Sequence, residues 1–251
     1  MHKLLYLNKV RKVTAHNPPG RYTIGNMHIN EIYQRLLRAY GPQGWWPVRG
    51  YEGRNPTKTG NLRGYHPGDY SFPRNDAERF EICTGAILTQ NTAWPNVERA
   101  IDGLAKCRAL SPEGILRIRP AKLAAAIRPS GYFNVKTKKL KIFAEFYTGL
   151  NGTTPARAQL LEVWGVGPET ADSILLYAFD QLEFVVDAYT RRILLHLGLI
   201  SANAGYDDIQ KFCTDGLRQS VAVYQECHAL FVEHAKWCYT RHPREDTLLT
   251  P

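Results

Sequence analysis

Residues 158–179, with the sequence AQLLEVWGVGPETADSILLYAF, constrain the fold of this chain more than any other segment. Their pattern predicts an amphipathic helix that ends at Trp164, a tight turn at residues 165–167 and a second helix that begins at Pro168. Both glycines of the turn can take the positive φ angles that other residues avoid, and proline suits the first position of a helix. The hairpin therefore exposes backbone N–H groups at a helix N-terminus, where a phosphate can bind. An inert connection between two packed helices could have the same sequence.

Most of the remaining chain is also patterned for helices. From Ala77 almost to the C-terminus, apolar residues recur at helical spacing and the connections are short. Upstream, residues 29–41 (INEIYQRLLRAYG) predict a helix that Gly41 ends. Residues 181–186 (QLEFVV) have strand character but are too few to build a sheet. The expected fold class is therefore all-α.

Residues 51–75 interrupt this pattern, because they are rich in glycine, proline and asparagine and have no periodicity. A loop of this length is uncommon in a compact domain. We therefore expect it to be either functional or disordered.

The charge of the chain favours a polyanionic partner. The net charge is +9, which suits binding to nucleic acid, although an ordinary basic protein would have the same balance. No stretch approaches the roughly 20 apolar residues that cross a bilayer, and residues 1–14 do not have the pattern of a signal peptide. The expected location is the cytoplasm.

The five cysteines do not follow a metal-binding pattern. They contain no C-x-x-C pair, and their spacing repeats no zinc or iron–sulfur motif. We expect free, partly buried thiols at Cys83, Cys107, Cys213, Cys227 and Cys238.

Asp187 is the strongest candidate for a catalytic group. It follows the apolar run 184–186, which should be buried, and stands where a new helix begins. Aspartate is a good N-cap, so its role could be purely structural. A carboxylate beside a phosphate-binding hairpin can also stabilise positive charge that develops at C1′ of a sugar, and it can help to activate water.

Residues 160–178 (LLEVWGVGPETADSILLYA) and 185–193 (VVDAYTRRI) together resemble the helix-hairpin-helix and aspartate signature of the endonuclease III-like DNA glycosylases. The likeness extends over residues 77–241, with a fragment at residues 45–47. It implies two helical domains, an active site in the groove between them and Asp187 as the catalytic carboxylate.

This resemblance also divides the chain. We expect residues 1–27 to form an N-terminal extension. Residues 28–77 and 183–251 should form one discontinuous helical domain. Residues 78–182 should form a six-helix-type domain that carries the hairpin at residues 158–180.

Two departures from the family pattern are informative. Members that also cleave the strand carry a lysine two residues after the last hairpin glycine, and here this position holds Glu169. A carboxylate cannot form a Schiff base, so we expect a monofunctional enzyme that uses water. Many relatives hold a four-cysteine iron–sulfur cluster after the last helix, but no cysteine follows Cys238. We therefore expect no such cluster.

Four lysines of another predicted helix are expected to be solvated and without the nucleophile's role. They are Lys136, Lys138, Lys139 and Lys141.

The resemblance assigns two kinds of DNA contact. Gln90 stands where relatives place a polar residue that fills the gap left by a flipped base, although a polar residue could also simply cap a helix. Phosphate contacts are expected from the hairpin residues Gly165, Val166, Gly167, Glu169 and Thr170. A Na⁺ or K⁺ ion held by hairpin carbonyls is compatible with the family, and no other cofactor is expected.

Residues 45–47 (WWP) and 88–94 (LTQNTAW) resemble one branch of the family, the 3-methyladenine DNA glycosylases of the endonuclease III type. This likeness implies a base pocket formed by Trp45, Trp46, Pro47 and Trp94. Aromatic faces attract cations, which suits positively charged alkylated purines. The tryptophans could instead be core or surface anchors, and the insertion at residues 49–75, with Tyr65, Tyr70 and Phe72, could reshape the pocket.

The sequence therefore predicts a base excision repair glycosylase that flips a damaged base, with an alkylated purine such as 3-methyladenine as the expected substrate, out of double-stranded DNA and hydrolyses its N-glycosidic bond. It should act as a monomer in the cytoplasm, associated with the nucleoid. One alternative is a monofunctional glycosylase for a mismatched or oxidised base. Another is a helix-hairpin-helix module that binds DNA without catalysis.

Overall fold

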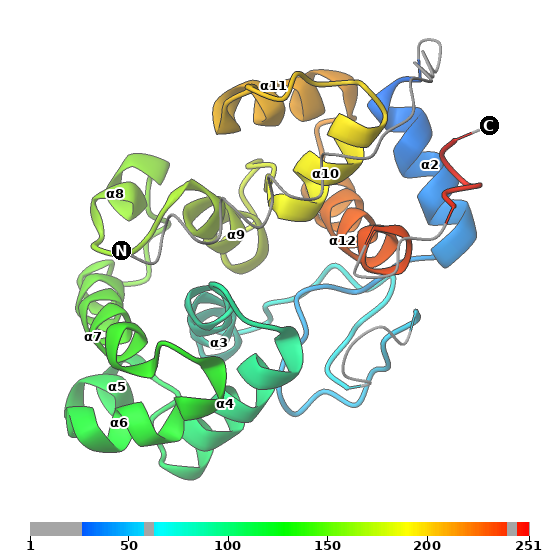
Figure 1. Cartoon of the computed structure of the whole chain (residues 1–251). Coiled ribbons are helices and arrows are strands. Elements are labelled where there is room, and N and C mark those ends of the chain that lie inside the picture. Colours follow the sequence, from blue (N-terminus) through cyan, green and yellow to red (C-terminus); the bar gives the residue numbers. More distant parts are fainter. Residues whose placement is uncertain (1–26, 58–62, 240–244, 251) are drawn as a thin grey trace.

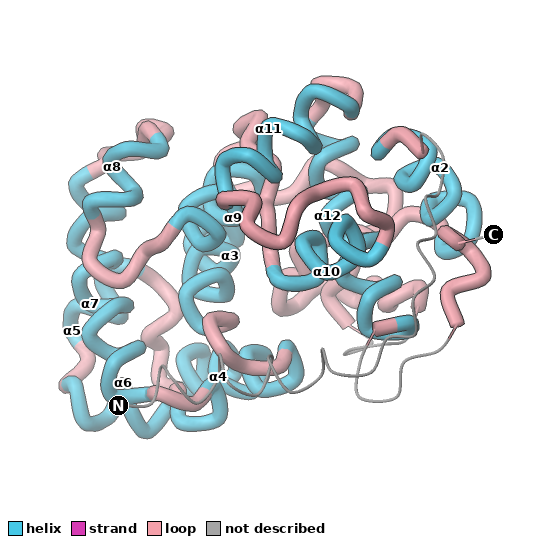
Figure 2. The backbone as a smooth tube through the Cα atoms, turned by 45° about the horizontal axis from the view of Figure 1, so that its top comes forward, coloured by secondary structure: helices cyan, strands magenta, loops and turns pink. Residues whose placement is uncertain are grey.

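The computed structural model describes residues 27–57, 63–239 and 245–250, and within these ranges the fold is all-α, with no strand, as the sequence predicts (Figures 1 and 2). The predicted extension lies, apart from Met27, outside the described residues. In chain order the helices are α2 (Ile29–Tyr40), α3 (Asp76–Leu88), α4 (Trp94–Lys106), α5 (Pro112–Arg117), α6 (Pro120–Ala126), the 3₁₀ helix η1 (Arg128–Ser130), α7 (Phe133–Gly149), α8 (Arg157–Glu162), α9 (Pro168–Ala178), α10 (Ala188–His196), α11 (Tyr206–Gly216) and α12 (Val221–Cys238).

The helices form two groups that meet along α9 and α12. Helices α3 to α9 lie on one side of Figure 1, where α3 packs against α4, α7 and α9, and α7 packs against α5 and α6. On the other side, α12 packs against α2 and α10. Contacts between α9 and α12 join the groups. No described helix is long and apolar enough to cross a membrane.

Helix α2 shows how the sequence sets these elements. Ile32 and Leu36 lie one turn apart and are fully buried, since residues three or four apart share a helix face. Gly41 ends the helix as predicted, because its φ of 71° is readily available to glycine and its N–H donates to the Leu37 carbonyl at 2.9 Å.

Residues 43–49, which we name the tryptophan loop, are anchored at both ends by buried carboxylates. Glu226 of α12 accepts the Gln43 N–H at 2.8 Å, and Glu81 of α3 accepts the Arg49 N–H. Burial raises the pKa of Glu81 to about 7, although the Arg49 N–H opposes this rise. The loop is thereby held between helices of both groups.

The described part of the insertion packs directly on the tryptophan loop. Backbone bonds join Val48 to Gly64 and His66 to Gly44, at 3.0 and 3.1 Å. The imidazole of His66 also contacts the Trp46 carbonyl at 3.0 Å. These residues of the insertion therefore support the loop that was predicted to form the base pocket.

Candidate active site

The hairpin between α8 and α9 begins its second helix at Pro168 as predicted, but its first helix ends at Glu162 rather than at Trp164, and only one of its glycines uses a positive φ. Gly165 has φ +90°, where any other residue would be strained. Gly167, the N-cap of α9, has φ −104° and ψ 178°, which is ordinary extended backbone. The prediction that both glycines take positive φ is therefore wrong for Gly167. A Cβ on Gly167 would meet nothing within 4 Å, so the missing side chain leaves the outer surface of the hairpin open.

The start of α9 offers backbone donors to a ligand. Pro168 has no N–H, and the Val166 N–H is already bonded to the Val163 carbonyl at 3.0 Å. Within the described chain, the N–H groups of Glu169 and Thr170 have no backbone partner, as expected for a first helical turn. The positive end of the helix dipole adds to their attraction for an anion. Of the predicted phosphate contacts, Val166 is thus the one whose N–H is occupied.

Asp187 is the N-cap of α10 and is nearly buried. Its Oδ1 accepts the Thr190 N–H at 2.7 Å, and its side chain is 11 % exposed. The preceding residues 184–186 are buried, as predicted. Burial alone would raise the pKa of Asp187, but the His228 imidazole and the Thr190 N–H together hold it below its usual value. The carboxylate is therefore charged at neutral pH in a largely dry setting.

No local sequence pattern marks His228 of α12, whose imidazole faces this carboxylate. Its Nε2 lies 3.7 Å from Asp187 Oδ2, and its Nδ1 lies 2.7 Å from the hydroxyl of Tyr177 on α9. His228 and Tyr177 are both buried. Two helices distant in sequence thus converge on Asp187.

The predicted pocket residues lie in the same cluster. Trp46 packs edge-on against Trp94 and Tyr177, with ring centroids 5.4 and 5.3 Å apart, and Trp45 packs edge-on against His228 at 5.7 Å. Trp45 and Trp94 are half-buried, whereas Trp46 is 6 % exposed and lies over Gly85 of α3. Pro47 is buried beside them. An unbroken set of aromatic contacts therefore leads from Trp94 to Asp187.

Gln90 lies against the hairpin. Its Nε2 donates to the Gly165 carbonyl at 3.1 Å and to Thr170 Oγ1 at 2.9 Å, while its Oε1 accepts from Lys139 Nζ. The structure thus brings the predicted gap-filling residue and the predicted phosphate site together.

The expectation that the lysines of α7 are solvated is wrong for three of them. Lys136 is buried and donates to the carbonyls of Leu88 and Ser130, each at 2.7 Å, so that it joins the C-terminal ends of α3 and η1. Burial lowers its pKa to about 8. Lys139 donates to Gln90, and Lys141 donates to the carbonyls of Leu116 and Ile118 at the end of α5. Helix C-terminal carbonyls attract cations, which explains why lysines occupy these places.

Glu169, which occupies the position of the family's lysine, is an exposed residue in the first turn of α9. Its side chain keeps an exposed face, yet desolvation by the surrounding protein and, to a smaller extent, the charge of Asp187 raise its pKa to about 7. A duplex on this face would remove more water and strengthen the rise. The pKa of Glu169 therefore lies above that of Asp187, so the two carboxyl groups of one site titrate in different pH ranges.

A buried hydrogen-bond network centred on Asp172 of α9 holds the segments around the site together. Asp172 is fully buried and accepts two hydrogen bonds from Arg157, at 2.7 and 3.0 Å. It also accepts from the Tyr206 hydroxyl at 2.7 Å and from Gln210 Nε2 at 2.9 Å. Tyr206 and Gln210 belong to α11, so the carboxylate joins the two helix groups.

The same network holds the segment that leads to Asp187. The Val186 N–H donates to the Tyr206 hydroxyl at 3.3 Å, and Gln210 Nε2 donates to the Phe184 carbonyl at 2.8 Å. The position of Asp187 thus depends on side chains from α9 and α11.

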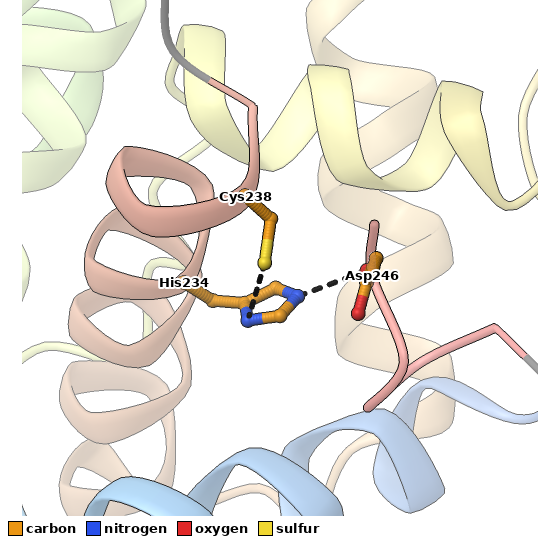
Figure 3. Close-up of side chains that lie close together, drawn as sticks. All are labelled: His234, Cys238 and Asp246. Carbon is orange, nitrogen blue, oxygen red and sulfur yellow. Dashed lines mark hydrogen bonds and ion pairs between the residues drawn. The ribbon is translucent and has the colours of Figure 1, made fainter. Parts of the chain in front are cut away.

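A second buried cluster lies at the end of α12 (Figure 3). His234 Nε2 is 3.0 Å from Asp246 Oδ2, and His234 Nδ1 is 2.9 Å from the Tyr40 hydroxyl and 3.8 Å from Cys238 Sγ. An imidazole, a thiol and a carboxylate could bind zinc. Here both ring nitrogens already have hydrogen-bond partners, and Asp246 Oδ1 accepts the Leu249 N–H at 2.9 Å. The potential metal ligands therefore satisfy one another's hydrogen-bonding groups. Through these bonds the cluster holds residues 246–250 against α12 and α2.

This cluster does not fit an iron–sulfur centre. It supplies a single thiol, whereas the clusters of relatives take four. Burial would raise the pKa of Asp246, but hydrogen bonds from His234 and Tyr239 lower it to about 2. The carboxylate thus stays charged over the working pH range and serves as a hydrogen-bond acceptor.

The site thus combines a helical hairpin with open N–H donors, a buried carboxylate and aromatic side chains, and known proteins with related sequences identify its family. The model of the family described as HhH-GPD superfamily base excision DNA repair protein matches residues 84–219. The chain is also 41% identical over 219 residues to a Methanocaldococcus jannaschii protein named provisionally as a DNA repair glycosylase, which covers 83% of this chain and 87% of that protein. The chain belongs to the HhH-GPD superfamily of base excision DNA repair proteins and is a DNA repair glycosylase.

Solved structures agree with this assignment. The H. pylori 3-methyladenine DNA glycosylase bound to 1,N6-ethenoadenine is similar with a TM-score of 0.63 and 25% identity, over 84% of this chain and 98% of that one. A non-covalent endonuclease III–DNA complex is similar with a TM-score of 0.68 over 89% of this chain and 94% of that one, at 16% identity. The second likeness shows the fold alone.

Proposed function

We propose that this glycosylase is monofunctional and removes alkylated purines such as 3-methyladenine from double-stranded DNA. The observation that carries the proposal is the set of contacts that runs from Trp94 through Trp46 and Tyr177 to His228 and Asp187. Trp45 and Trp94 are half-buried, so their exposed faces could stack a base, and Trp45 packs against His228, which faces the carboxylate. The likeness to a 3-methyladenine DNA glycosylase supports the choice of base.

In the proposed reaction the damaged nucleotide leaves the helix stack, its base lies against the aromatic wall and its sugar faces Asp187. As the glycosidic bond breaks, its electron pair leaves with the base and positive charge develops at C1′. The Asp187 carboxylate stabilises this charge and accepts a proton from the attacking water. An alkylated purine is already positively charged, so it departs as a neutral base without an acid from the protein.

The aromatic surfaces differ in their availability to a cationic base. Trp45 has Lys236 Nζ 5.4 Å from its ring, and this ammonium is paired with Glu233 at 2.8 Å. Trp94 is half-buried, and in the described part of the chain no cation lies over its ring. Its indole N–H donates a hydrogen bond to Glu98 at 3.1 Å. We therefore assign stacking of the charged base chiefly to Trp94.

We expect Trp94→Ala to lower the efficiency of 3-methyladenine release by between about tenfold and a few hundredfold, because cation–π attraction and base stacking are each worth roughly 1–3 kcal/mol. Trp94→Phe should recover part of this loss. Single-turnover release from a duplex with one lesion measures both variants, and thermal melting is the control. A parallel fall in melting temperature and activity would instead assign Trp94 to the core.

We expect borohydride to trap no covalent complex between the protein and lesion-containing DNA, because Glu169 cannot form a Schiff base. Strands should break only after alkali, which a denaturing gel of end-labelled duplex would show. The matched variant is Glu169→Lys, which places an amine at the family's lysine position and should produce a trapped adduct. A strong borohydride-trapped adduct between the wild-type protein and DNA would show that another amine forms a Schiff base. The protein would then not be monofunctional.

We expect Gly167→Ala to weaken binding to every duplex alike while leaving the melting temperature nearly unchanged. The backbone of Gly167 suits any residue and a Cβ meets nothing in the free protein, so stability has no reason to fall. A phosphate drawn to the hairpin would meet the added methyl group, and phosphate contacts carry no sequence information. Fluorescence anisotropy with damaged and undamaged duplexes tests this. Loss of binding for one lesion only, or none at all, would contradict the phosphate site.

The family's monovalent cation remains compatible with the hairpin. The Gly165 carbonyl accepts one hydrogen bond, from Gln90, and keeps a second lone pair that could ligate Na⁺ or K⁺. Such an ion would attract a phosphate and would take no part in bond cleavage. We also propose that the protein binds DNA as a monomer.

A panel of duplexes, each with one lesion, tests the proposed substrate most directly. Free base and alkali-sensitive sites are measured for alkylated, mismatched and oxidised bases. Faster release of a mismatched or oxidised base than of 3-methyladenine would favour the alternative glycosylase. Binding without release from any duplex would favour a module that has lost catalysis.

A further inference from the structure

We infer that His228 is a positioning residue for Asp187, and that it acts by directing an Nε2 proton toward the carboxylate. The inference rests on the proposed role of Asp187 in base release. It assigns a function to a residue of α12 that is not among the predicted phosphate contacts.

The first argument is that the two carboxylate oxygens of Asp187 have separate partners. Oδ1 accepts the Thr190 N–H at 2.7 Å, and Oδ2 faces His228 Nε2 at 3.7 Å. The latter distance is longer than that of a direct hydrogen bond. Together, the N-terminus of α10 and the side chain from α12 fix the plane of the carboxylate. The side chains of His228 and Asp187 are 5 % and 11 % exposed, so little water competes with this pairing.

The second argument concerns the proton on His228, which Tyr177 controls. The Tyr177 hydroxyl lies 2.7 Å from His228 Nδ1 and 3.1 Å from the Gln225 carbonyl. If the hydroxyl donates to Nδ1, the neutral imidazole carries its proton on Nε2. If it donates to the Gln225 carbonyl, Nδ1 must donate to the hydroxyl, and a proton on Nε2 makes the ring an imidazolium. Since a bare Nε2 lone pair would repel the carboxylate, both arrangements put a proton between His228 and Asp187.

The other ionisable groups near Asp187 show why a proton on His228 Nε2 is needed to keep the carboxylate charged. Burial raises the pKa of Glu169 of α9 and of Glu226 of α12, the carboxyl groups on the helices that carry Tyr177 and His228. Lys236 is one positive group near the site, but it lies over Trp45 and is paired with Glu233. Burial without the imidazole would therefore favour the neutral acid of Asp187, which can neither stabilise positive charge nor accept a proton.

The test compares His228→Phe and His228→Gln with the matched control His28→Gln, which makes the same change at an exposed histidine outside the site. Single-turnover release is measured against pH, DNA affinity is measured separately, and the titration of the Asp187 carboxyl is followed by NMR in free protein. In His228→Phe we expect the Asp187 titration and the acid limb of the rate profile to move upward by about one pH unit or more. Release at neutral pH should fall about tenfold or more, with DNA affinity nearly unchanged.

His228→Gln keeps a hydrogen-bond donor that can face the carboxylate, so it should recover part of the rate that His228→Phe loses. If His228→Phe does not fold, His228→Gln and Tyr177→Phe carry the test, because both should still move the titration of Asp187. Wild-type titration and wild-type rates in these variants would overturn the inference while leaving the glycosylase intact. If the wild-type protein releases no base from any duplex, the proposed function fails, and the NMR titration still decides whether His228 controls Asp187.

Discussion

Replacing Asp187 with asparagine is expected to lower base release by about a hundredfold or more, the scale of a lost acid–base group. Asparagine has nearly the same size and is as good an N-cap as aspartate, so its oxygen should still accept the Thr190 N–H. The variant loses the negative charge that the oxocarbenium-like transition state requires. Single-turnover release from 3-methyladenine duplexes measures the effect.

Two further measurements separate chemistry from folding in the Asp187→Asn variant. The melting temperature should change little, and affinity for lesion-containing duplex should be unchanged or higher, because one negative charge near the DNA has been removed. Near-native release by a well-folded variant would show that Asp187 is only a helix cap and that the mechanism proposed above is wrong.

Replacing Asp172 with alanine is expected to destabilise the protein by about 3–5 kcal/mol, the cost of removing one partner of a buried ion pair. Arg157, Tyr206 and Gln210 would lose their shared acceptor. The Arg157 side chain is 26% exposed and can regain some water, which favours the lower end of this range. A loss of about 3 kcal/mol lowers the melting temperature of a chain of this size by roughly 6–12 °C.

The matched control is Asp215→Ala, which breaks the exposed pair between Asp215 and Lys211. Exposed pairs contribute about 1 kcal/mol or less, so calorimetry should show a small change. Similar losses in both variants would mean that the Asp172 network does not join the helix groups. Base release by folded Asp172→Ala protein should also fall, since Tyr206 holds the Val186 N–H next to Asp187.

The sequence predicts what local patterns control. Helical periodicity, Gly41 and Pro168 gave the helices and their ends, and the run 184–186 gave a buried approach to Asp187. Within the hairpin, sequence alone could not separate the two glycines, since one occupies a left-handed position and the other leaves open space.

Contacts between distant segments were beyond the sequence. His228 and Tyr177 meet Asp187 only because α9 and α12 pack together, and nothing in their local patterns marks them. The lysines of α7 looked solvated because lysine usually is. Lys136 is buried because the carbonyls of two other segments converge on it, which no periodicity of α7 reveals.

Because α2 packs against α11 and α12, it can complete its packing only late in synthesis, after these helices have left the ribosome. Helix α2 is made early, yet the surfaces that cover Ile32 and Leu36 come from residues 206–238, near the end of synthesis. Helices α3 to α9 find their mutual contacts within residues 76–178, so the hairpin can assemble while the chain is still growing. Until α12 emerges, the nascent protein exposes the apolar face of α2, and a chain cut before α11 would expose it permanently.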